Sequence, residues 1–131
     1  MRIIVDKVDS GRRHSVSKQD IRAIFASVPT DWREGVKEVR LANGFRARLP
    51  VWLVGGEMTI LSRGVAKQVV VEEILIQLAK NALGLRRGLG QLTNADRVKL
   101  TAMIQPYLRS VWQNIEDART PKVHELKLNH A

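Results

Sequence analysis

The chain has 131 residues, of which 44% are hydrophobic, enough for one domain with an apolar core and too many for a disordered protein. It contains no cysteine, which excludes disulfides, thiolate nucleophiles and cysteine-ligated metals. Its 22 Lys and Arg residues against 13 Asp and Glu give a net charge of +9, and such a charge attracts polyanions, nucleic acid first.

The N-terminal part is expected to form a strand, a turn and a helix. Residues 2–8 carry a central Ile-Ile-Val run that is typical of a strand, and residues 9–13 are rich in turn formers. Ser17 and Asp20 have the spacing of a capping box. The helical stripe that follows consists of Ile21, Ile24, Phe25 and Val28, and Pro29 ends the helix.

A β-hairpin is predicted next. Residues 36–41 and 45–53 both alternate between apolar and polar side chains, and Asn43-Gly44 lies between them. A two-residue turn would place apolar residues opposite arginines, so a three-residue loop over 42–44 is favoured. That register pairs Leu41 with Phe45 and Val39 with Ala47, and it sets Glu38 opposite Arg48.

Residues 65–83 form the longest apolar helix candidate. Before them, Gly55-Gly56 predicts a second turn and 57–61 a short strand. One face of the helix collects Val70, Val71, Ile74, Leu75, Leu78 and Ala82. A second apolar strip (Val69, Ile76 and Leu83) indicates neighbours on more than one side, so this helix is expected at the centre of the fold. Gly84 follows at a C-cap position.

The C-terminal part is expected to contain one more long helix. Residues 85–92 form a Gly- and Arg-rich loop, and Thr93 to Asp96 cap the next helix. Apolar residues keep helical spacing straight through Pro106, which favours one kinked helix, with two abutting helices as the alternative. Residues 120–131 are expected to form a polar tail, with a weak last strand as the alternative.

These elements predict an α+β fold with one domain over residues 1–119. A small, mostly antiparallel sheet is expected to pack on the central helix, with an N-terminal helix beside it and the C-terminal helix closing the core. Charged and amide side chains interrupt residues 65–83, so no segment is expected to span a membrane. A cytoplasmic location is the default expectation, since no signal peptide is recognisable at the N-terminus.

Glu72 is the candidate buried acid on the central helix. It lies between Val69, Ile76 and Ala79, where burial would suit it to general acid–base chemistry. Since no second catalytic group accompanies it, pairing with an arginine or extension to solvent is favoured. Its neighbour Glu73 is expected to be solvated.

The order of elements over residues 17–83 is similar to that of the minimal zincin metallopeptidases. A helix, a short β-meander containing GEMTILS and a long helix with a central glutamate carry this resemblance. In zincins an HExxH helix supplies two zinc-binding histidines and a glutamate that activates water. If Glu72 matches that glutamate, the ligand positions fall on Val71 and Leu75; if Glu73 matches it, they fall on Glu72 and Ile76. Neither pair can form the site, so the resemblance implies a relative that has lost its metal and the hydrolysis.

Two groups of arginines are candidate contacts for anions. Arg40, Arg46 and Arg48, with Trp52 on the same side of its strand, suit phosphate contact and base stacking on single-stranded nucleic acid. The alternative is a solvated sheet face. Arg86 and Arg87 precede the Thr93 cap and could assist phosphate binding at a helix start, with an ordinary basic loop as the alternative. The histidines, His14, His124 and His130, have no ligand spacing and are expected at the surface.

The sequence therefore predicts a non-enzymatic binding module with nucleic acid as its leading partner. No catalytic residue, metal ligand or cofactor is predicted. Two alternatives stay open: an inactive zincin-like domain that binds another protein, and a metal-free enzyme that uses Glu72. The oligomeric state does not follow from the sequence.

Overall fold

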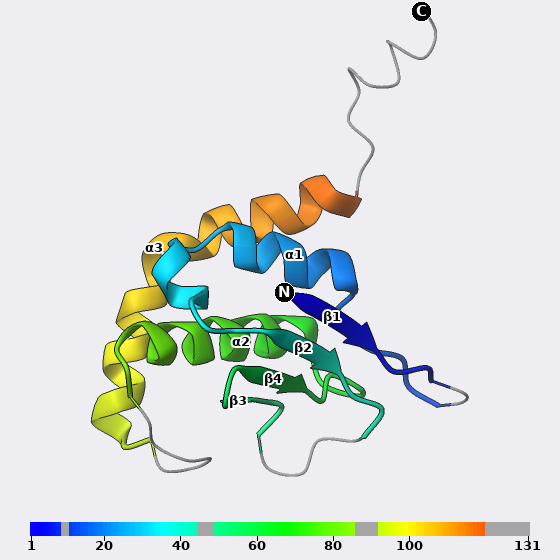
Figure 1. Ribbon diagram of the computed structural model, residues 1–131. Helices are drawn as coiled ribbons and strands as arrows, with labels where there is room; N and C mark the ends of the chain where they lie inside the picture. The colour runs from blue at the N-terminus through cyan, green and yellow to red at the C-terminus, as the bar shows by residue number, and fades with distance from the viewer. Residues whose placement is uncertain (9–10, 45–48, 86–91, 120–131) are drawn as a thin grey trace, which may run out of the picture.

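The computed structural model describes residues 1–8, 11–44, 49–85 and 92–119 (Figure 1). Four short strands, β1 (Arg2–Val5), β2 (Glu38–Leu41), β3 (Val51–Val54) and β4 (Glu57–Ile60), form one sheet in the order β1-β2-β4-β3. The β1–β2 and β2–β4 pairs are parallel and only β3–β4 is antiparallel. The sheet is therefore mixed, and the prediction of a mostly antiparallel sheet is wrong, although the fold is consistent with the α+β class.

The predicted hairpin between β2 and β3 is also wrong. Strand β2 lies between β1 and β4, so that Val39 is in register with Ile3 and with Met58. The hairpin joins β3 to β4 instead, and its two-residue turn is Gly55-Gly56, with φ of +58° and +81°. Positive φ at both positions is what a type I′ turn requires, and glycine adopts it without strain.

The described residues also form three α-helices and a short 3₁₀ helix: α1 (Lys18–Ala26), η1 (Thr30–Arg33), α2 (Lys67–Ala82) and α3 (Asn94–Arg119). Helix α2 lies along the sheet, α1 lies beside it, and α3 packs against both (Figure 1). The apolar face of the sheet, which includes Val39, Leu41, Met58 and Ile60, is buried beneath these helices. The opposite face carries the polar side chains of the same strands.

Helix α2 is the central element that the sequence predicts. Five residues of its predicted apolar stripe, Val70, Val71, Ile74, Leu75 and Leu78, are at 0% exposure, while Ala82 is half-buried. Burial of each such fully buried side chain stabilises the fold by about 1.5–3 kcal/mol. Of the predicted second strip only Ile76 is buried, because Val69 and Leu83 are 41% and 38% exposed. The helix ends in a Schellman motif, because Gly84 (φ +66°) and Leu85 donate their main-chain N–H groups to Asn81 O and Lys80 O.

Helix α3 runs through Pro106 as a single helix, which decides between the two alternatives left by the sequence. The helix changes direction along its length (Figure 1), as expected where proline removes a main-chain hydrogen bond. Its buried residues, Leu100, Ile104, Val111 and Ile115, close the core. Tyr107 also meets the buried Trp32 of η1 edge to face, with 4.9 Å between ring centroids.

Candidate nucleic-acid interface

The carboxyl ends of the three parallel strands meet at one side of the molecule (Figure 1). We call the loops there the carboxyl edge and define it as residues 6–8, 11–20, 42–44 and 61–67. Loops at this edge of a parallel sheet commonly carry binding residues, because several of them converge on one place. The starts of α1 and α2 belong to the same edge.

Arg63 joins three loops of the carboxyl edge. Its guanidinium is buried, with the residue only 8% exposed. The Nε atom donates to Arg12 O over 2.7 Å, and Nη1 donates to Asn43 O and Oδ1 over 2.7 and 2.8 Å. These charge-assisted hydrogen bonds fix the loop after β4 to the loops after β1 and β2.

Asp6 and His14 form a second connection at this edge. The Asp6 carboxylate accepts from Arg40 Nη1 over 3.1 Å and from the Asn43 main-chain N–H over 3.2 Å. His14 Nε2 donates to Asp6 O over 2.9 Å, and its Nδ1 lies 3.5 Å from Ser62 Oγ. Ser62 is fully buried and accepts from Ser15 N, so this serine and histidine hold loops together and present no nucleophile to solvent. The expected surface position for His14 is therefore wrong, since the ring is half-buried.

Among the described residues of the carboxyl edge, six are basic and two are acidic. Arg40 and Asn43 engage Asp6, and Lys67 Nζ lies 3.1 Å from the buried carboxylate of Asp20. Four other cations of the edge are exposed and form no ion pair with a carboxylate of the described residues: Lys7, Arg12, Arg13 and Lys18. The edge therefore carries an excess of positive charge that its own carboxylates do not cancel.

The starts of α1 and α2 differ in how their free N–H groups are satisfied. At α1 the predicted capping box is confirmed, because Ser17 Oγ accepts from Asp20 N and Asp20 Oδ2 accepts from Ser17 N. At α2 the N-cap residue is Ala66, which makes no side-chain cap, and the first turn holds no acidic residue. The first turn of α2 therefore supplies neither a side-chain cap nor a carboxylate to the positive end of its own dipole.

Arg12 lies beside this uncapped start. A Cβ placed on Gly64, which has φ of +74°, would come within 3.2 Å of Arg12 Cδ, so the arginine stem crosses the loop just before α2. Lys7, Arg12, Arg13 and Arg63 were not among the predicted site residues. Arg12 and Arg13 had one sequence signal, the turn-rich segment over residues 9–13, whereas the parallel pairing that gathers these loops is not visible in the sequence.

The sheet face predicted to bind nucleic acid is only partly assembled among the described residues. Arg40 and Trp52 do lie on one face, in one row with Thr59 between them, and two strand spacings separate them by about 10 Å. Arg40 is engaged by Asp6, and Glu38 pairs with Arg2 at 2.6 Å. Arg46, Arg48, Arg86 and Arg87 lie outside the described residues, as does the polar tail over 120–131.

Glu72 and Glu73 are both half-buried, and it is Glu73 rather than Glu72 that pairs with an arginine. Glu72 is half-buried, and Gln68 Nε2 donates to its Oε1 over 3.4 Å. Glu73 is not solvated: its side chain is 16% exposed, its Oε1 lies 3.2 Å from Arg97 Nη1, and its Oε2 is buried without a partner in the described part of the chain. Helix α3 supplies Arg97, and its packing on α2 was not predictable in this detail.

No group of three or more His, Cys, Asp and Glu residues suited to a metal ion occurs among the described residues. In that same part of the chain, no helix combines the length and the hydrophobicity that a membrane crossing needs. No family model, curated protein or solved structure matches the chain. The zincin-like resemblance therefore stays a prediction, and a proposal of function depends on the geometry of the chain itself.

Proposed function

We propose that this chain binds nucleic acid, and that the carboxyl edge is where the phosphate backbone lies. The observation that carries the proposal is the set of four exposed cations, Lys7, Arg12, Arg13 and Lys18, on an edge where both carboxylates are already engaged. Phosphates attract such unpaired cations, and release of their counterions supplies most of the binding free energy.

The uncapped start of α2 supports the same proposal. Main-chain N–H groups in the first turn of a helix bind phosphate oxygens, and the helix dipole favours the negative charge. Arg12, whose stem crosses Gly64, can contribute a planar guanidinium to a phosphate at that position. We therefore place one phosphate at the α2 start, with its neighbours along the loop that carries Arg12 and Arg13.

Salt-dependent binding to DNA and RNA tests the proposal. Labelled oligonucleotides, single- and double-stranded, are titrated with the wild type and with an Arg12→Gln/Arg13→Gln variant over a salt series. We expect the variant to bind about tenfold more weakly at low salt, with the slope of log K against log salt smaller by roughly 1.4 to 1.8. Glutamine keeps the polar stem while it removes the charge.

A variant of the same net charge distinguishes binding at the carboxyl edge from general electrostatic attraction of nucleic acid to a basic protein. Lys99→Gln/Arg109→Gln removes two exposed cations of α3 and gives the same net charge. It is expected to retain most of the affinity. Equal losses in the two variants, or wild-type binding no stronger than that of a lysine-rich peptide, contradict the proposal.

A further inference from the structure

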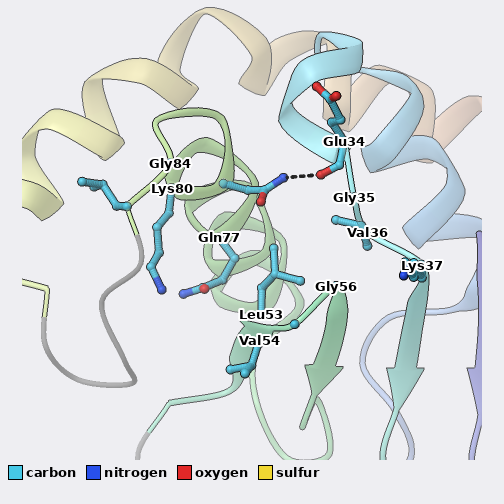
Figure 2. Close-up of a pocket in the computed structure, with 13 residues that line it drawn as sticks. Glu34, Gly35, Val36, Lys37, Leu53, Val54, Gly56, Gln77, Lys80 and Gly84 are labelled. Carbon is cyan, nitrogen blue, oxygen red and sulfur yellow. Dashed lines mark hydrogen bonds between the residues drawn. The ribbon is translucent and has the colours of Figure 1, made fainter.

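A cavity of about 550 Å³ opens on the opposite side of the molecule (Figure 2). Three segments line it: residues 34–37 between η1 and β2, residues 53–56 around the β3–β4 turn, and the C-terminal part of α2 with its cap. We call this side the amino edge, because β2 and β4 begin there. Cavities of roughly 300–1,000 Å³ are those in which proteins bind small organic molecules.

Gln77 is the buried polar group of this cavity. The residue is 4% exposed, and its side-chain amide points from α2 into the cavity (Figure 2). That amide makes no hydrogen bond to a described residue. The amide is not among the unpartnered polar atoms that are closed off from solvent, so its polar atoms remain accessible and a ligand in the cavity can form hydrogen bonds with them.

Lys80 follows Gln77 by three residues and therefore lies on the same face of α2. Its side chain extends in the same direction as the Gln77 amide (Figure 2). Burial lowers the pKa of Lys80, because the ammonium loses hydration. An anion in the cavity would restore part of the lost solvation.

The remaining walls are held in place and combine polar and apolar surface. Asn81 Nδ2 donates to Trp32 O and to Glu34 O, both over 2.9 Å, and so fixes the end of η1 against α2. The Glu34 carboxylate points away from the cavity (Figure 2), so it does not oppose an anion there. Val36 and Leu53 supply apolar surface.

We propose that this cavity binds a small carboxylate with an apolar body. The carboxylate accepts hydrogen bonds from Lys80 Nζ and Gln77 Nε2, and the apolar body lies against Val36 and Leu53. The proposal is independent of nucleic-acid binding, because the cavity and the carboxyl edge share no residue.

Titration with hexanoate, followed by ¹H–¹⁵N NMR, tests this inference. We expect saturable shifts at the Gln77 side-chain amide and at the main-chain amides of Gly35, Gly55 and Gly56. Hexanamide, the neutral analogue, is expected to bind at least about tenfold more weakly, since it lacks the charge. Equal affinities for the two probes would overturn the proposal, as would shifts confined to the carboxyl edge.

Two variants assign the binding to its residues. Lys80→Met and Gln77→Leu keep the side-chain size, and each is expected to weaken hexanoate binding roughly tenfold or more, whereas the exposed Lys99→Met retains it. Thermal unfolding provides a separate check, because Gln77→Leu removes an amide without a partner and should not lower the stability. A marked loss of stability in Gln77→Leu would show that the amide stabilises the fold. An unchanged affinity of Lys80→Met for hexanoate would show that the anion binds elsewhere. Either result overturns the proposal.

Discussion

The two edges of the sheet differ in charge and in shape. The carboxyl edge holds six basic and two acidic residues and joins its loops through Arg63. On the amino edge the cavity lining holds two basic residues, Lys37 and Lys80, and one acidic residue, Glu34. One edge is therefore suited to an extended polyanion and the other to a small ligand.

The difference follows from how the strands are connected. Three parallel strands end at the carboxyl edge, so three separate loops meet there and must be held together by side chains. At the amino edge a two-residue turn reverses the chain. Main-chain hydrogen bonds connect this turn to the start of β2, because Gly56 O accepts from the N–H groups of Lys37 and Glu38. Substitutions can test each of these connections.

The largest effect is expected at Arg63. An Arg63→Met substitution removes the donor to three carbonyl oxygens, two of them on Asn43, and should lower the free energy of unfolding by about 3 kcal/mol. Urea denaturation measures this change. The exposed Arg22→Met on α1 is the control and should stay within about 0.5 kcal/mol of the wild type. Similar values for the two variants mean that Arg63 does not join the loops.

A smaller loss is expected at the turn of the amino edge. In Gly56→Ala the new Cβ would come within 2.6 Å of Gly35 O, and the φ of +81° adds strain, so we expect a loss of about 2 kcal/mol. Gly55→Ala meets nothing within 4 Å and should lose only about 1 kcal/mol through its positive φ. Thermal or urea unfolding of the pair separates close contact from strain. Equal losses indicate that the approach of Gly35 is unimportant.

The uncapped start of α2 predicts opposite changes in stability and binding. Ala66→Asp supplies an N-cap and should stabilise the protein by roughly 0.5–1 kcal/mol, while its carboxylate occupies the place proposed for a phosphate. Urea unfolding and oligonucleotide titration should thus move in opposite directions. Ala66→Ser adds the cap without the charge, so it should stabilise the helix with a smaller loss of affinity. If both variants bind as the wild type does, no phosphate lies at this helix start.

The smallest effect is expected from Lys80 as the pH changes. Burial lowers the pKa of Lys80 in the folded chain below the ordinary 10.5. At pH values between this lowered pKa and 10.5, the unfolded chain therefore binds more protons than the folded chain. This residue therefore makes wild-type stability rise with pH in that window. The stability of Lys80→Met relative to wild type should decline as the pH is raised from 7 toward 10.5, as followed by urea unfolding. A difference that is constant with pH contradicts the lowered pKa.

Local signals predicted the helices well. The Ser17–Asp20 capping box is confirmed, and Thr93 and Asp96 exchange the same two hydrogen bonds at the start of α3. The buried stripe of α2 is also as predicted, except that Ala82 is half-buried. Each of these features depends on residues within one or two turns of each other, so a single sequence contains the relevant information.

Strand pairing was predicted poorly because it depends on distant segments. The Asn43-Gly44 signal was strong, yet β2 pairs with β1 and β4, which supply two apolar neighbours for Val39 and Leu41 instead of one. The alternation predicted for residues 36–41 is confirmed in β2, whereas residues 45–48 lie outside the described residues. Alternation does not specify which strand lies alongside. The hairpin prediction therefore failed because β2 buries its apolar side chains better between β1 and β4 than it would beside a single strand.

The sequence by itself determined the net positive charge, the absence of thiol chemistry, the helices with their caps and the apolar face of α2. The tertiary structure alone decided which cations gather and which are neutralised, because Arg40 meets Asp6 and Lys67 meets Asp20 only across the fold. It also decided that Gln77 points into a cavity. Composition and periodicity depend on residues that are close in the sequence. Ion pairs and cavities form between segments that are distant in the sequence, so only the folded structure shows them.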